Sequence, residues 1–248
     1  MKIADIELGD RPLFLAPMED VTDPSFRYMC KRFGADVVYT EFISSDGLIR
    51  DAGKSLAKLR IAESERPVGI QLYGHLVEPM VEAARIAEAA DPDIIDINFG
   101  CPVKKIAGRG AGSGMMRDVP LMVEMTRRIV EAVKKPVTVK TRIGIDDQDS
   151  YEFLCDFINT VSGNGECEMF IIHARKAWLS GLSPKENREI PPLDYDRVYQ
   201  LKRDFPHLTM SINGGIKSLE EAKIHLQHMD GVMVGREAYQ NPGILASV

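Results

Sequence analysis

Eight short apolar runs recur along the 248 residues of the chain. Each run is nearly continuous rather than alternating with polar residues, which is typical of parallel strands that are covered on both faces. The runs occupy residues 13–18, 37–42, 68–73, 94–99, 137–142, 169–174, 208–213 and 231–235. Helical segments between them complete eight strand–helix units. The sequence therefore predicts an α/β fold, a single (β/α)8 TIM barrel, and the chain has the length of about 250 residues that this fold needs.

The segments between the runs carry helical signals. Ser218 followed by Glu221 predicts a capping box at the start of one helix. Residues 3–8, ahead of Gly9, are expected to form a small hairpin that plugs the bottom of the barrel. Because no linker or low-complexity segment interrupts the pattern, we expect one domain over residues 1–248. Apolar positions recur at helical spacing in 80–90, 120–133, 193–205 and 218–228.

Charge and cysteine usage narrow the functional class. A net charge of −6 does not indicate a nucleic-acid-binding protein, although it leaves room for a local basic patch. The four cysteines show no CxxC spacing and the N-terminus has no secretory apolar segment, so we expect reduced thiols in the cytoplasm. The longest apolar runs have the length of strands, so we expect no membrane contact. We expect no metal site either, and the oligomeric state stays open.

Two glycine turns follow the last two strand runs. Gly214-Gly215 and Gly235-Arg236 offer backbone N–H groups with no obstructing Cβ atoms on the glycines. Barrel enzymes often bind a phosphate at these two loops, and Arg236 would add a charge-assisted contact. The alternative is that the glycines only permit tight turns. We interpret the pair as a phosphate site.

Three polar residues interrupt apolar strand runs. A lysine that points into a barrel mouth needs an anionic partner or a lowered pKa, and Lys140 is such a candidate, either to stabilise an anionic ring or to form a Schiff base. His173 occupies the matching place on the sixth run, and Gln71 lies on the third. The alternatives are a lysine that faces outward and core side chains with satisfied hydrogen bonds.

A cysteine follows the fourth run, in the sequence NFGCP of residues 98–102. Loops at this end of the strands carry the chemistry of barrel enzymes, so Cys101 is a candidate for a reacting thiol; the alternative is an inert buried cysteine. Residues 100–114 do not fit the G-x-G-x-x-G dinucleotide fingerprint. This segment contains five glycines and three cations, which are Lys104, Lys105 and Arg109. We interpret it as a mobile basic lid.

A second long loop spans residues 176–192. Loops of this length are uncommon unless they are functional. Trp178, Lys185 and Arg188 are candidates to stack on a base and to contact phosphates, and a solvated loop with no such role is the alternative.

Taken together, the motifs resemble those of the tRNA-dihydrouridine synthases over essentially the whole chain. The resemblance implies a barrel that binds FMN and reduces the C5=C6 bond of uridine in tRNA with electrons from NADPH. The matching segments are residues 16–18 (APM), 21–23 (VTD), 71–74 (QLYG), 98–102 (NFGCP), 139–142 (VKTR), 173–175 (HAR), 213–215 (NGG) and 235–236 (GR).

The same resemblance assigns roles to individual residues. Cys101 would protonate uridine C5 as the general acid, and Asn98 would orient the uracil. Arg175, Lys185 and Arg188 are carried over as contacts to the RNA. The residues that would bind the flavin ring are Ala16, Pro17, Met18, Gln71, Lys140 and His173, and those that would hold its phosphate are Asn213, Gly214, Gly215, Gly235 and Arg236.

Two departures from the family pattern lead to further expectations. Residues 1–135 resemble the bacterial B type and residues 136–248 the A type, which suggests an engineered chimera of two half-barrels with impaired activity. We expect the chain to lack the C-terminal helical domain that helps family members to grip tRNA, and we therefore expect weakened tRNA binding. The alternatives are a chimeric scaffold that binds FMN without turnover, and a barrel lyase or aldolase that uses Lys140 as a Schiff base.

Overall fold

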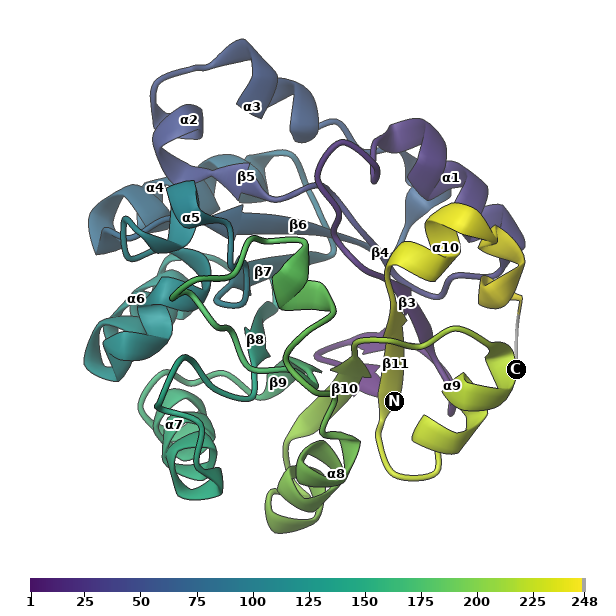
Figure 1. The fold of residues 1–248 in the computed structure, drawn as a ribbon. Coiled ribbons are helices and arrows are strands. Elements are labelled where there is room, and N and C mark those ends of the chain that lie inside the picture. Colours follow the sequence, from purple (N-terminus) through teal and green to yellow (C-terminus); the bar gives the residue numbers. More distant parts are fainter. Residues whose placement is uncertain (247–248) are drawn as a thin grey trace.

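Eight parallel strands form a barrel in the computed structural model, which describes residues 1–246. A ring of helices surrounds them (Figure 1). The barrel closes between its first two strands through a Phe14–Val37 bridge, where the Leu15 N–H donates to the Val37 carbonyl at 2.9 Å. The predicted TIM barrel is confirmed. Its strands, in order around the barrel, are β3 (Leu13–Leu15), β4 (Val38–Tyr39), β6 (Val68–Tyr73), β7 (Ile94–Asn98), β8 (Val137–Arg142), β9 (Met169–His173), β10 (Thr209–Asn213) and β11 (Gly231–Val234). The short β5 (Ile43–Ser44) pairs with the end of β6.

The predicted N-terminal hairpin is also present. β1 (Lys2–Ile3) and β2 (Ile6–Glu7) pair antiparallel, with Ile3 opposite Ile6. Ile3 is buried in one cluster with Ile94 and Met169, which begin their strands. The hairpin therefore covers the N-terminal end of the barrel, and the opposite end is left for the site.

Each predicted helix is found within a few residues of its expected bounds: α4 (Val77–Ala89), α6 (Val119–Ala132), α8 (Tyr195–Asp204) and α9 (Leu219–His225). Ser218 caps α9 by accepting from the Glu221 N–H, but the Glu221 carboxylate accepts from the Lys217 N–H, one residue before the position that a capping box requires. The remaining helical elements are α1 (Pro24–Phe33), α2 (Ser45–Ile49), α3 (Gly53–Lys58), α5 (Lys104–Ala107), α7 (Tyr151–Gly163), α10 (Arg236–Gln240) and the short 3-10 turns Glu63–Glu65, Gly112–Arg117, Glu186–Arg188 and Pro242–Leu245.

A buried ion pair fixes α1 to the chain ahead of β6. Arg27 Nε lies 2.7 Å from Glu65 Oε2, and both side chains are at most 2% exposed. The same guanidinium donates to the carbonyl groups of Thr22 and Arg60. Each of the three nitrogens of this cation thus donates to an acceptor, which compensates for the burial of its charge.

Successive side chains of each strand point alternately outward and inward, so the barrel has two hydrophobic cores. Outward-facing residues such as Ile70 and Val139 pack under the helices, and inward-facing ones such as Phe14 and Ile171 fill the barrel. Toward the C-terminal ends the interior becomes polar, with these buried residues on inward-facing positions: Gln71, Asp96, Asn98, Thr138, Ser211 and Asn213. The polar layer lies directly below the open end. No helix among residues 1–246 combines the length and hydropathy that a membrane crossing requires.

Candidate active site

A cleft of about 1230 Å³ opens at the C-terminal end of the barrel. This volume exceeds the roughly 300–1,000 Å³ of a typical small-ligand pocket, so it accommodates a cofactor together with a substrate ring. Of the residues that the family resemblance assigns to the site, Lys185 alone does not line the cleft; it is exposed on the loop after β9. The cleft brings together the other predicted residues: Ala16, Pro17, Met18, Gln71, Asn98, Cys101, Lys140, His173, Arg175, Arg188, Asn213, Gly214, Gly215, Gly235 and Arg236.

A chain of side-chain amides runs from the barrel interior to the cysteine loop. Gln71 Nε2 donates to Asp96 Oδ2 at 2.6 Å, and Asn98 Nδ2 donates to Gln71 Oε1 at 2.9 Å. Asn98 Oδ1 then accepts from the backbone N–H groups of Gly100 and Cys101 at 3.0 and 2.9 Å. At the other end of the chain, Thr138 Oγ1 donates to Asp96 Oδ1 at 2.6 Å. The loop that carries Cys101 is therefore tied to the centre of the barrel.

The Cys101 thiol is half-buried at the cleft wall. Burial raises the pKa of Cys101, and this outweighs the Val103 N–H and the cations Arg142 and Lys140, which lower it. The side chain consequently remains a protonated thiol at neutral pH. A thiol of this kind keeps a proton that it could donate and is poorly suited to act as a nucleophile.

Lys140 points into the cleft, as predicted, and not outward between helices. Its Nζ donates to Asn213 Oδ1 at 3.1 Å, and Asn213 Nδ2 in turn donates to the Met233 carbonyl at 2.9 Å. Burial lowers the pKa of Lys140 to about 8, with a further contribution from Arg142. The ammonium is thus held by one neutral side chain and is ready to pair with an anionic ligand.

His173 stands on the neighbouring strand with an unsatisfied ring nitrogen. Among residues 1–246 nothing hydrogen-bonds its buried Nδ1 atom. Burial, together with Arg142 and Lys140, holds the pKa of His173 well below its usual range, so the imidazole is neutral. A buried polar atom left without a partner is costly, which favours a ligand-contacting residue over a satisfied core histidine.

The two turns interpreted as a phosphate site lie side by side at the ends of β10 and β11. Gly214 and Gly215 adopt φ values of +117° and +73°, which side chains rarely tolerate, whereas Gly235 does not have a positive φ. A Cβ on Gly215 would lie 2.4 Å from Leu193 Cδ1. Within residues 1–246, none of the backbone N–H groups of residues 214, 215, 235 and 236 donates a hydrogen bond. These donors are available to an anion.

Arg236 and Arg175 both contact the loop after β9. Arg236 Nη1 lies 3.3 Å from Glu189 Oε1, and Arg236 Nη2 donates to the Arg188 carbonyl at 3.2 Å. Arg175 Nη1 donates to the carbonyl groups of Glu189 and Pro191. These contacts hold the loop over the mouth of the cleft and place Arg188 at its rim.

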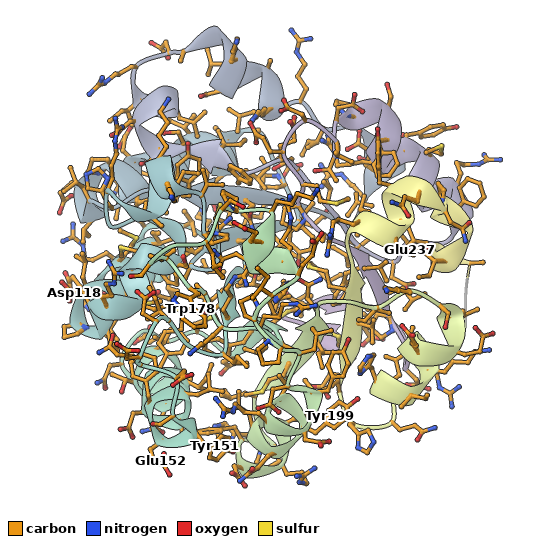
Figure 2. All side chains as sticks on the ribbon, in the orientation of Figure 1. Asp118, Tyr151, Glu152, Trp178, Tyr199 and Glu237 are labelled. Atoms are coloured by element: carbon orange, nitrogen blue, oxygen red, sulfur yellow. The ribbon has the colours of Figure 1, made fainter. Side chains whose placement is uncertain are left out.

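The rest of this loop is folded on itself. Asn187 is buried and exchanges two 2.7 Å hydrogen bonds with the Trp178 backbone. Trp178, labelled in Figure 2, is 43% exposed and stacks under the Lys176 ammonium, 5.1 Å from the ring centroid. Trp178 does not line the cleft, so of the three predicted contacts on the loop only Arg188 reaches it.

The segment expected to be a mobile lid is packed instead. Residues 104–117 form α5 and a 3-10 turn whose apolar side chains are buried, and Ser113 donates to the Cys101 carbonyl from both its N–H and its hydroxyl. Its glycines allow close backbone contacts: a Cβ on Gly114 would lie 2.3 Å from the Ala107 carbonyl oxygen. The glycines thus serve packing, which composition alone does not distinguish from flexibility.

Two contributors to the site were missed in the sequence. Arg142, fully enclosed, donates from Nε to the Gly100 carbonyl at 2.8 Å and from Nη1 to the carbonyls of Lys176 and Asn187 at 3.2 Å, so it joins both loops. Asp96 holds Gln71. Both lie two residues from a predicted site residue on the same strand, and period-two alternation was the signal that places them inside the barrel.

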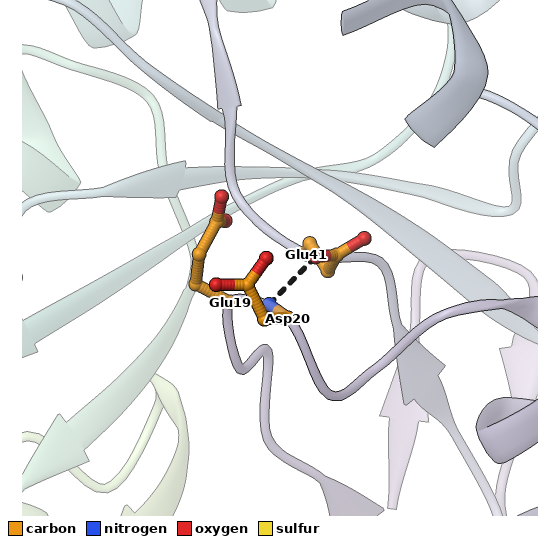
Figure 3. Close-up of side chains that lie close together, drawn as sticks. All are labelled: Glu19, Asp20 and Glu41. Carbon is orange, nitrogen blue, oxygen red and sulfur yellow. Dashed lines mark hydrogen bonds between the residues drawn. The ribbon is translucent and has the colours of Figure 1, made fainter. Parts of the chain in front are cut away.

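Three carboxylates gather beside the cleft on Glu19, Asp20 and Glu41 (Figure 3). Glu41 accepts from the Asp20 N–H at 2.7 Å, and Lys58 Nζ lies 2.5 Å from Glu19 and 3.8 Å from Glu41. Lys58 already compensates part of the charge of this cluster. We assign it no metal role.

Comparison with known proteins now supplements the geometry. The family model described as Dihydrouridine synthase (Dus) matches residues 14–248. A protein of Escherichia coli (strain K12) called tRNA-dihydrouridine(20/20a) synthase is 62% identical over 235 residues, which are 94% of this chain and 67% of that protein. The protein of the same name from Vibrio cholerae is 53% identical over 237 residues, 95% of this chain and 72% of its own length. The chain thus spans about two thirds of these relatives.

A solved structure of histamine dehydrogenase from Rhizobium sp. 4-9 matches with a TM-score of 0.67. It covers 98% of this chain and 46% of the other, at 12% sequence identity. At this identity the likeness concerns the barrel fold alone.

The expected join between two half-barrels is not supported. The 62% alignment to one protein covers 94% of the chain and so extends through both of the expected halves, 1–135 and 136–248. The hypothesis of a chimera is withdrawn, and with it the impaired activity and the inactive scaffold that were derived from a misfit of halves. The match to one enzyme family also removes the support for a Schiff-base lyase built on Lys140.

Proposed function

The chain belongs to the dihydrouridine synthase family, and we propose that its cleft binds FMN and reduces the C5=C6 bond of uridine in tRNA with electrons from NADPH. The observation that carries this proposal is the placement of Cys101, a half-buried thiol with a raised pKa, in one cleft with Lys140, His173 and the glycine turns. The names of the relatives suggest that the uridine to be reduced lies at position 20 or 20a of the tRNA.

The chemistry of the cleft fits a flavin phosphate. The N–H groups of residues 214, 215, 235 and 236 have no acceptor among residues 1–246, and the side chain of Arg236 lies next to them. Four such donors with one guanidinium match the oxygens of a phosphate monoester. Gly214 and Gly215 leave no Cβ between the turn and this anion.

The inner wall of the cleft fits the ring of the cofactor. Within the described residues 1–246, His173 Nδ1 lacks a partner and Lys140 pairs only with the neutral Asn213, so both suit the heteroatoms of an isoalloxazine. Pro17 and Met18 would cover one ring face, and Gln71 would contact its edge. The charged Lys140 would favour a ring that becomes anionic on reduction. When bound, the reduced flavin would supply hydride to uridine C6.

The residues of this chain would provide the matching proton. Cys101 would transfer its thiol hydrogen to uridine C5, so that a hydride and a proton together convert the C5=C6 double bond into a single bond. Asn98, whose amide is oriented by Gln71, would keep its remaining N–H for a uracil carbonyl. Arg142 would hold the cysteine loop through the Gly100 carbonyl.

RNA binding is proposed for the rim of the cleft. Arg175 and Arg188 lie at its mouth, and Lys104, Lys105 and Arg109 extend the cationic rim along the packed segment after Cys101. Phosphate contacts from such residues supply affinity that depends on salt. A cytoplasmic location follows from a tRNA substrate.

Replacement of Cys101 tests the proposal. Cys101→Ala should retain a flavin absorbance band after desalting and should still be reduced by NADPH, while dihydrouridine formation, followed by mass spectrometry of digested tRNA, falls by about 10²–10⁴-fold. Cys155→Ala on α7, outside the cleft, is the matched control and should remain active. A wild-type protein that cannot be loaded with FMN, or full activity of Cys101→Ala, would overturn the proposal.

A further inference from the structure

Asp96 lies at the start of the amide chain that ends at Cys101. Its side chain is fully buried, and both of its oxygens accept hydrogen bonds, from Thr138 and from Gln71, each at 2.6 Å. In the described part of the chain, its side-chain hydrogen bonds go to Gln71 and Thr138 and not to the Cys101 loop. Any effect on that loop must pass through Gln71 and Asn98.

The groups at the two ends of this chain, the Asp96 carboxylate and the backbone N–H groups of Gly100 and Cys101, require the same direction for its hydrogen bonds. A deprotonated carboxylate only accepts, so Gln71 has to present its NH2 group to Asp96. Its carbonyl oxygen is then left to face Asn98, which donates to it at 2.9 Å. This in turn leaves Asn98 Oδ1 as the acceptor for the N–H groups of Gly100 and Cys101. Reversal of one amide would place two donors or two acceptors against each other.

We propose that Asp96 is a positioning residue for Cys101, because its carboxylate fixes the orientation of the Gln71 and Asn98 amides and thereby anchors the backbone of the cysteine loop. The same orientation decides that Asn98 offers an N–H, and not a carbonyl oxygen, to the substrate. The substrate group opposite Asn98 would therefore be a hydrogen-bond acceptor such as a carbonyl oxygen. The inference relies on the proposed function only for the role of Cys101, since the anchoring itself concerns this chain alone.

Amide hydrogen exchange tests the anchoring without any activity measurement. In Asp96→Leu, which is similar in size and cannot accept, the amides of Gly100 and Cys101 should exchange at least tenfold faster than in the wild type. The Phe99 N–H donates to the Lys140 carbonyl at 2.8 Å and should keep its protection. It serves as an internal reference within the same peptide region.

Asp96→Asn removes the negative charge but can keep the directions of the hydrogen bonds, so it shows which of the two anchors the loop. Its carbonyl oxygen can still face Gln71, and its NH2 group can donate to the Thr138 hydroxyl, so protection of Gly100 and Cys101 should return to within about twofold of the wild type. Asp36→Leu is the matched control. That carboxylate accepts from the Leu13 N–H at 2.7 Å at the opposite end of the barrel, and its loss should leave the cysteine loop unchanged.

Activity gives an independent readout. Asp96→Leu should slow the transfer to tRNA in a single turnover while reduction of the bound cofactor by NADPH changes less than threefold, and Asp96→Asn should restore the transfer. If Asp96→Leu does not fold, Gln71→Met interrupts the chain one link later and should produce the same loss of protection. Unchanged exchange at Gly100 and Cys101 in these variants, or equal loss in Asp96→Asn, would overturn the inference whether or not the protein reduces uridine.

Discussion

Arg236 at the end of β11 pairs with Glu189 across the mouth of the cleft, with 3.3 Å between Nη1 and Oε1. Both side chains are about half exposed, at 54% and 52%. The guanidinium proposed to bind a phosphate therefore already has a carboxylate partner on the loop after β9. A phosphate that arrives at the turns of β10 and β11 would compete with Glu189 for this cation.

Removal of Glu189 should accordingly strengthen FMN binding. An exposed ion pair contributes up to about 1 kcal/mol, so Glu189→Gln is expected to lower the Kd of FMN by up to about fivefold. Arg236→Ala should raise it by roughly tenfold to a hundredfold, the range for a hydrogen bond to a charged group. Fluorescence quenching of FMN on titration measures both. Glu220→Gln, an exposed position on α9, is the control, and a weaker affinity of Glu189→Gln would contradict competition.

Gly215 offers a test of the phosphate turn. Gly215→Ala should abolish stable FMN loading, because its Cβ would lie 2.4 Å from Leu193 Cδ1 and 2.9 Å from Tyr195 Oη. Gly181→Ala is the control. Gly181 also has a positive φ, +88° compared with +73° at Gly215, but a Cβ at this position would have no atom within 4 Å. Absorbance after desalting should therefore be lost in the first variant and kept in the second. Equal loss in both would attribute the effect to backbone strain alone.

The burial of Asp96 predicts a pH-dependent stability difference. Burial raises the pKa of Asp96 from its usual value of 3.8 to about 7, against the opposing effects of Gln71, Thr138 and Lys140. Between these two values the folded protein binds more protons at this site than the unfolded chain, so its stability falls as the pH rises. Asp96→Asn does not titrate. Its free energy of unfolding relative to the wild type should be roughly 2–3 kcal/mol more favourable at pH 8 than at pH 5 in urea titrations. A difference independent of pH would contradict the shift.

The buried pair of Arg27 and Glu65 should matter for stability and not for chemistry. Arg27→Met leaves the Glu65 carboxylate without its partner and should lower the free energy of unfolding by about 3–5 kcal/mol. The double variant with Glu65→Leu removes both charges and should recover much of this loss. Urea denaturation of the two proteins at one pH measures the difference. Similar stabilities of the single and double variants would show that the orphaned charge is not the cause.

The sequence allowed the barrel and most of the cleft to be predicted, for a common physical reason. Strands covered on both faces need continuous apolar runs, and in a parallel barrel all their C-terminal ends meet at one rim. Residues that end a strand run, such as Asn98, His173 and Asn213, consequently converge whatever the details of packing. Helix α1 has residues typical of helix ends at both of its termini, since Asp23 accepts from the Phe26 N–H and Gly34 has a φ of +118°.

Loop structure lay beyond this reasoning. The position of Lys185 off the cleft depends on how Asn187 folds its loop, and the pairing of Arg236 depends on where that loop leaves Glu189. The supposed lid is packed because its glycines meet backbone atoms from elsewhere in the segment. Such contacts join residues with no shared periodicity, so composition supplied the wrong expectation of mobility.

The hairpin under the barrel would affect the order in which NADPH and tRNA can bind. With Ile3 packed against Ile94 and Met169, the interior is closed at its N-terminal end, and the cleft opens only at the opposite rim. A nicotinamide donor and an RNA molecule would then have to reach the same face of the cofactor through the same opening of the cleft. Under the proposed function, the two would bind one after the other, and an excess of either should inhibit binding of the other.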